Sequence, residues 1–149
     1  MRRGPVAVLL LAAALAAYLL RGAPGLPDAA PAPAPAASAP DDALARAIAT
    51  RARDVQVRGH GTVMRVFADD RRGSRHQRFI VRLPSGGTVL VAHNIDLAPR
   101  LASLDPGDAV EFAGEYEWTD RGGVVHWTHH DPAGRHPGGW LRHEGRTVQ

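Results

Sequence analysis

The chain has 149 residues, room for one ordinary domain, and a modest formal net charge of +3 at pH 7. It contains no cysteine, which excludes disulfides and thiolate metal sites. All 18 basic residues are arginine, a usage that we attribute to coding bias rather than to guanidinium chemistry at every position. The informative features are therefore the distribution of charge and of histidine along the chain.

Residues 1–21 have the form of an export signal or a membrane anchor. Arg2 and Arg3 precede seventeen uncharged residues, mostly Ala, Leu and Val. As a helix rising ~1.5 Å per residue, this run would span roughly 25 Å, slightly less than a bilayer core of ~30 Å. No convincing small-residue cleavage site follows it, so we favour an anchor over a signal peptide that is cut to leave a periplasmic or secreted protein. Either way the membrane is an expected partner, and the rest of the chain is exported.

Two short segments separate this leader from the main domain. Residues 22–40 contain six prolines among alanines, which predicts a disordered, extended linker. Residues 41–54 begin with an Asp-Asp pair that can cap a short helix, with Leu44 and Ile48 on one face. Because that apolar stripe is thin, we expect the helix to be marginal or docked on the domain.

From Val55 onward, apolar residues recur at every second position, which predicts β-strands. On this parity Val63 and Phe67 both face the core, and Gly59 and Gly61 between the flanking valines suit a bulge or bend. The pattern predicts an all-β domain at 55–149, folded as a small five-stranded OB-like barrel, with a small open antiparallel sheet as the alternative. The expected elements are strands at 55–67, 77–83 and 88–93, a short helical connection at 94–104, and strands at 110–117 and 124–128.

Histidine gathers at the C-terminal end of the chain. Five of the eight histidines lie between Gly122 and Gly145, together with two tryptophans. Imidazole binds metals, moves protons near neutral pH and donates hydrogen bonds to anions, so this segment is a candidate site. No standard metal-binding spacing is matched. The alternatives are a zinc or manganese site, a metal-free acid–base or anion site, and a structural lid with no ligand.

The histidine segment supplies specific candidates. If the strand ends converge, imidazoles distant in sequence, including His60, would meet the turn after the fifth strand. His136 and His143 are the candidate proton donors of a catalytic site. The candidate metal ligands are His93, His126, His129 and Asp131.

Arginine gathers in the first two predicted strands. Seven arginines lie between residues 58 and 82 against two aspartates, and in an OB barrel this region is part of the usual ligand face. A solvated strand face is the alternative, as is pairing with the acidic run at 105–120, whose Glu111, Glu115 and Glu117 are expected to face outward. The candidate ligand-binding residues are Arg78, Arg82, His93, Asn94 and Trp127.

Five segments carry a likeness to known sequences. They begin at Gly59 (Gly-His-Gly-Thr-Val), His76 (His-Gln-Arg-Phe-Ile-Val), Ala92 (Ala-His-Asn-Ile-Asp-Leu-Ala-Pro-Arg), Gly114 (Gly-Glu-Tyr-Glu-Trp) and Gly123 (Gly-Val-Val-His-Trp-Thr-His-His-Asp-Pro). Together they resemble a family of short exported bacterial proteins that is catalogued as a domain of unknown function. The resemblance covers about Val55 to Gln149 and implies an exported, OB-like domain. It implies no activity, substrate or catalytic residue.

Three functional hypotheses remain at this point. The leading one is an exported binding module whose Arg/His/Trp cleft takes an anionic ligand such as a nucleic acid fragment, a nucleotide or a sugar. The second is a metal-dependent hydrolase that uses the C-terminal His/Asp cluster. The third is a structural domain with no ligand. The first two require that imidazoles far apart in the chain meet in one pocket beside the tryptophans.

Overall fold

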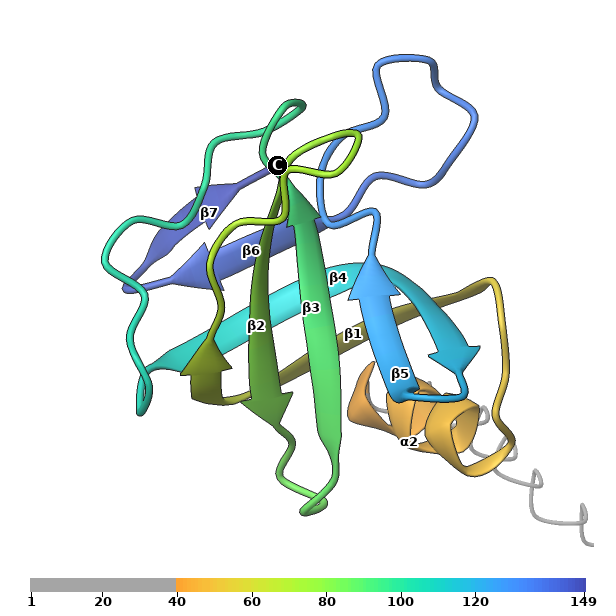
Figure 1. Ribbon diagram of the computed structural model, residues 1–149. Helices are drawn as coiled ribbons and strands as arrows, with labels where there is room; N and C mark the ends of the chain where they lie inside the picture. Colours follow the sequence, from red (N-terminus) through yellow and green to blue (C-terminus); the bar gives the residue numbers. More distant parts are fainter. Residues whose placement is uncertain (1–39) are drawn as a thin grey trace, which may run out of the picture. The chain divides into compact units, whose positions relative to one another are not determined.

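A computed structural model describes residues 40–149 (Figure 1). The expected leader at 1–21, and the expected linker up to residue 39, lie outside the described residues. No helix within 40–149 has the length and hydropathy needed to span a bilayer. The elements are α2 (Pro40–Ala49), β1 (Val55–Val66), β2 (His76–Arg82), β3 (Thr88–Asn94), β4 (Ala109–Thr119), β5 (Gly122–His126), β6 (Trp140–His143) and β7 (Arg146–Val148).

β1 closes five strands into a barrel by pairing with β2 along one edge and with β4 along the other. The order around the barrel is β1-β2-β3-β5-β4, in which β3 and β5 run parallel and the other neighbours are antiparallel. The predicted OB-like barrel is therefore confirmed. The sequence pattern did not predict β6 and β7, which form a hairpin that extends the sheet from β4 (Figure 1).

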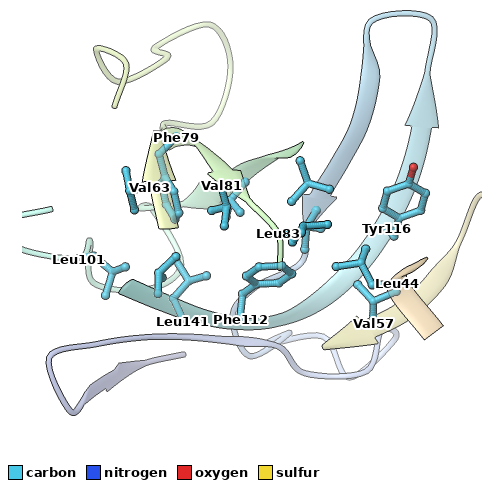
Figure 2. Packing of buried hydrophobic residues seen from close by; sticks show 14 of the residues in the cluster. Leu44, Val57, Val63, Phe79, Val81, Leu83, Leu101, Phe112, Tyr116 and Leu141 are labelled. Atoms are coloured by element: carbon cyan, nitrogen blue, oxygen red, sulfur yellow. The ribbon is translucent and has the colours of Figure 1, made fainter. Parts of the chain in front are cut away.

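The barrel interior is filled by alternate residues of its strands, as the period of two predicted. Phe79, Phe112 and Tyr116 are the largest of these buried side chains (Figure 2). Leu44 of α2 is 2 % exposed and packs into the same cluster, so the helix is docked on the barrel. α2 ends at Ala49 rather than at residue 54, because Arg51 has a left-handed backbone with φ of 52° that a helix cannot continue through.

Barrel closure depends on how closely the middle of β1 approaches the end of β2 and the Phe112 ring of β4. A Cβ atom at Gly61 would overlap the backbone carbonyl oxygen of Arg82, and one at Gly59 would lie 2.8 Å from the Phe112 ring. Glycine at both positions lets β1 cross from one half of the barrel to the other without a clash.

The bulge of β1 lies beyond the glycines, at Met64. Val63 pairs with Val81 and Arg65 pairs with Ile80, which leaves Met64 between them without a partner in β2. This extra residue reverses the inward and outward parity of the rest of the strand. The prediction that Phe67 faces the core is therefore wrong, and Val66 packs against the core instead.

The predicted helical connection at 94–104 is also wrong, because Asn94 ends β3 and residues 95–104 form turns and irregular backbone. Ala98 donates its N–H to the carbonyl oxygen of Asn94 at 3.3 Å, as in one helical turn. Pro99 follows and has no N–H to continue the pattern. Leu101 and Leu104 are nevertheless buried, so the apolar spacing reflects docking of this loop on the barrel.

Replacing Gly61 by alanine should lower the free energy of unfolding by about 1–3 kcal/mol, because the new methyl group displaces the paired backbone of β2. The control is Gly87→Ala in the β2–β3 turn. There the nearest atom to a Cβ, Ser85 Oγ, is 3.9 Å away, and alanine should be neutral or stabilising by about 0.4–1 kcal/mol. Urea unfolding of both variants measures the difference. Equal stability of the two would contradict the close approach.

Candidate functional site

A cleft of about 300 Å³ lies where the strand ends meet the loop between β5 and β6. Three histidines line it beside Trp127: His76 from β2, and His126 and His129 from the end of β5 and the loop after it. Of the three imidazoles expected to converge, only His126 lines this cleft. We call it the Trp127 cleft. Its lining residues are Ser74, His76, Ala92, Asn94, Leu97, His126, Trp127 and His129.

His93 lies behind this cleft and has no exposed surface. Its Nε2 is 3.0 Å from the carbonyl oxygen of Pro99, and its Nδ1 is 2.9 Å from Thr128 Oγ1. A carbonyl only accepts, so these partners assign the hydrogen to Nε2, and the Thr128 hydroxyl donates to Nδ1. Burial lowers the pKa of His93 and outweighs the raising effect of the Pro99 carbonyl. The imidazole is thus neutral, and it joins β3 to the loop at Pro99 and to Thr128, which follows β5.

The His93–Thr128 pair resembles a base and a hydroxyl nucleophile, but it cannot act as one. Thr128 has 0 % exposure, so no substrate reaches its hydroxyl. The returning loop covers it, because Gly139 donates its N–H to the carbonyl oxygen of His129 at 3.0 Å. A Cβ at Gly139 would lie 2.8 Å from Thr128 Cα. This pair therefore supports the cleft rather than doing chemistry in it.

Asp131 organises the loop that follows. Its Oδ1 accepts the N–H of Ala133 at 2.9 Å, and its Oδ2 accepts those of Arg135 and His136 at 2.7 and 3.0 Å. These backbone hydrogen bonds, that of Ala133 first, hold the pKa of Asp131 below its ordinary value. Both carboxylate oxygens are thus engaged by the loop itself.

The predicted metal set is not assembled in this structure. Within residues 40–149, no three histidine, aspartate or glutamate side chains are grouped so as to hold a metal ion. His93 and His129 lie edge to face with ring centroids 6.3 Å apart, and both are buried. His93 uses both ring nitrogens in the hydrogen bonds described above, which leaves no lone pair for a metal.

Glu115 is the site residue that the sequence reasoning missed. It was expected to face solvent, and it does point outward, but only 9 % of the residue is exposed. Its Oε1 is 3.6 Å from His126 Nε2 and its Oε2 is 3.8 Å from His136 Nδ1. Burial lowers the pKa of His126 more than the Glu115 carboxylate raises it. Only the pairing of Glu115 with His126 across β4 and β5 could have revealed this cluster.

Trp127 adopts an uncommon backbone conformation at the mouth of the cleft. Its φ of 51° is left-handed, which is unfavourable for a bulky residue and ends β5 before the predicted residue 128. The indole stacks on His136 with ring centroids 3.9 Å apart and lies 5.4 Å from His129. Such strain persists where the surroundings fix it, and it is concentrated at functional sites.

A second hollow, of about 250 Å³, lies beside Phe67, and we call it the Phe67 hollow. The guanidinium carbon of Arg65 is 4.8 Å from the centroid of the Phe67 ring, and that of Arg78 is 5.9 Å away. Arg78 Nη1 is 3.4 Å from Asp70 Oδ2, whereas its buried Nε has no hydrogen-bond partner in the described chain. The lining residues are Phe67, Arg78, Ile80, Thr88, Val89, Leu90, Arg121, Gly122 and Gly123.

Other predicted site residues lie elsewhere. Arg82 is exposed at the end of β2 and lines neither hollow. His143 is buried on β6, with its Nε2 3.0 Å from Asp108 Oδ2. His60 lies across from Glu111 on β4. The structure therefore gathers His76, His126 and His129 at the cleft, with His93 beside His129 and His136 stacked on Trp127, but not His60 or His143.

The buried neutral His93 makes stability dependent on pH. In the unfolded chain this imidazole takes up a proton as the pH falls through its ordinary pKa of 6.5, whereas in the folded protein the lowered pKa keeps it neutral. The free energy of unfolding should therefore decrease between pH 7.5 and pH 5. Urea unfolding across this range should show that the free energy of unfolding falls less steeply with decreasing pH in His93→Gln than in the parent protein. The exposed His130, changed to Gln, is the control and should retain the parent slope; equal slopes for all three proteins would refute the assignment.

The comparisons place the chain in one family. The family model described as "Protein of unknown function (DUF3465)" matches residues 30–149, which include every element of the barrel. No curated protein matches the chain. The barrel and the Trp127 cleft thus lie within the matched region, and the chain belongs to the DUF3465 family.

Proposed function

We propose that this domain is an exported binding module for a nucleotide or a short single-stranded nucleic acid. The observation that carries the proposal is that the Phe67 hollow and the Trp127 cleft lie next to each other on one face of the barrel. We call it the β2–β3–β5 face. Its outward-pointing residues are His76, Arg78 and Ile80 of β2, Leu90, Ala92 and Asn94 of β3, and Val124 and His126 of β5.

Phe67 gives this face a flat apolar surface beside positive charge. Bases bind through stacking on aromatic rings, and the phosphates bind through arginine. Phe67 combines both elements, because the guanidinium carbons of Arg65 and Arg78 lie 4.8 and 5.9 Å from the centroid of its ring. The β1 bulge is what turns this ring outward.

Arg78 is suited to exchange its present partner for a phosphate. Its ion pair with Asp70 is partly solvent-exposed, with 37 % and 33 % of the two side chains accessible. Exposed pairs of this kind contribute only about 0–1 kcal/mol, so a phosphate of the ligand competes with the carboxylate. A bidentate anion that draws the guanidinium away from Asp70 and exposes its Nε–Nη edge would also supply the acceptor that the buried Arg78 Nε now lacks.

The Trp127 cleft extends the same surface along the strands. Ala92 in the cleft and Arg78 in the Phe67 hollow are directly paired across β2 and β3, so the two hollows are adjacent. Trp127 offers a second ring, and Asn94 and His76 offer hydrogen-bonding groups. Two rings separated by β2 and β3 suit bases of one extended strand better than one small anion.

Export and attachment to the membrane belong to the same proposal. They rest on the basic residues and the apolar run at 1–21. A fusion of these residues to a reporter that is active only outside the cytoplasm tests export. Mass spectrometry of the mature N-terminus separates an anchor from a cleaved signal.

The binding proposal is tested with the exported domain and a fluorescein-labelled twelve-residue oligothymidylate, with ADP as a competitor. We expect saturable binding that weakens as salt rises, because phosphate contacts release counterions. Phe67→Ala and Arg78→Ala should each raise the Kd roughly tenfold, and Arg78→Ala should also reduce the salt dependence.

The matched control is Arg146→Ala on β7, an exposed arginine outside both hollows. It should leave the Kd unchanged within about twofold. Absence of binding at low salt would overturn the proposal and leave a structural role. An equal loss in all three variants would indicate non-specific attraction to a basic protein and would equally reject this face as the site.

A further inference from the structure

We infer that a groove on the outer face of β1, β4 and β6 binds a pyranose oligosaccharide. This groove has a volume of about 490 Å³, within the range of about 300–1,000 Å³ typical of ligand sites. The strands β1, β4 and β6 pass behind β2 and β3 in Figure 1, and the groove shares no lining residue with the Trp127 cleft or the Phe67 hollow. It is lined by Arg58, Gly59, His60, Glu111, Phe112, Trp140 and Arg142.

Strand register builds the groove from two parallel rows of side chains. In the first row Ala113 of β4 pairs with Arg58 of β1 on one side and with Trp140 of β6 on the other. Ala113 is buried, whereas its two cross-strand neighbours, Arg58 and Trp140, both line the groove. Trp140 is half-buried and lines the groove, so it forms an aromatic wall.

The second row places charges of both signs beside this wall. Glu111 of β4 lies between His60 of β1 and Arg142 of β6. Arg142 Nη1 donates to Glu111 Oε2 at 3.2 Å, and its Nε donates to Thr147 Oγ1 at 3.2 Å. Its guanidinium carbon also lies 5.0 Å from the centroid of the Trp140 ring. Arg142 is therefore committed to holding Glu111 and Trp140 in position, as a positioning residue.

The groups left for a ligand are an acceptor and a donor near an aromatic ring. Glu111 keeps 52 % of its side chain exposed, so its carboxylate can accept from a further hydroxyl. Arg58 is exposed and takes part in no ion pair with any other residue of the described chain. Its guanidinium can donate to two neighbouring oxygens at once.

This combination fits a saccharide better than the alternatives. The C–H bonds on one face of a pyranose ring pack against an indole, and its vicinal hydroxyls both donate and accept. A nucleic acid strand would place phosphates beside Glu111, whose repulsion opposes the attraction of Arg58. An apolar ligand would bury the charged groups of the second row without partners. OB-type barrels bind oligosaccharides as well as oligonucleotides, although usually on the face formed by their second and third strands.

The test uses the exported domain with cellotriose and triacetylchitotriose as probes, titrated by isothermal calorimetry and by NMR of the indole N–H groups. We expect at least one probe to bind and to shift the Trp140 signal more than that of Trp127. Glu111→Gln and Arg58→Ala should each weaken binding roughly tenfold, because each removes a charge-assisted hydrogen bond. Trp140→Phe should weaken it less, since a smaller ring retains part of the wall.

Matched controls come from the same strand and the same residue types. Glu117→Gln, on the outward face of β4 but outside the groove, should leave saccharide affinity unchanged, as should Arg146→Ala. Phe67→Ala should also leave it unchanged, which separates this site from the proposed nucleotide site. No binding of either saccharide, or binding that Glu111→Gln and Glu117→Gln weaken equally, would overturn the inference. Binding of oligothymidylate that is lost with Arg58→Ala would assign the groove to nucleic acid instead and would equally overturn it.

Discussion

Closing a barrel from only five strands requires β1 to pair with two partners, and the rest of the structure depends on that constraint. The strand meets β4 along its first half and β2 along its second, so it must bend sharply between them. Gly61 permits the close approach of the two backbones, and the bulge at Met64 completes the change of direction. The bulge has a chemical consequence, because it turns Phe67 from the core to the surface between two arginines.

The parallel pairing of β3 with β5 determines the other half of the site. It brings the end of β3 beside the residues that follow β5, where the buried imidazole of His93 meets the Thr128 hydroxyl. A buried imidazole must have partners for both nitrogens, so this contact fixes two loops as well as two strands. Trp127 and His129, on either side of Thr128, thereby acquire fixed positions in the cleft. The histidines around the cleft thus divide into those that line it, such as His76, and His93, which supports it from behind.

The two faces of the barrel differ in chemistry because different strands supply them. The β2–β3–β5 face combines arginines with a phenylalanine and a tryptophan, a combination suited to bases and phosphates. On the outer face of β1, β4 and β6, acidic residues of β4 are interleaved with arginines, which reduces its attraction for a polyanion. The acidic run of the sequence pairs mainly with Arg53, Arg142 and histidines rather than with the arginines of β2.

The sequence by itself determined the five strands of the barrel, though not β6 and β7, because a period of two with glycine and proline at the turns leaves few other ways to bury the apolar residues. It also located the histidine-rich segment beside Trp127. Only the tertiary structure decided which side chains meet, since the register between β4 and β5 and the bulge in β1 depend on pairing between distant segments. For that reason local periodicity assigned Phe67 to the core and Glu115 to solvent. It also led us to interpret Asp131 as a metal ligand, although its oxygens accept hydrogen bonds from its own loop.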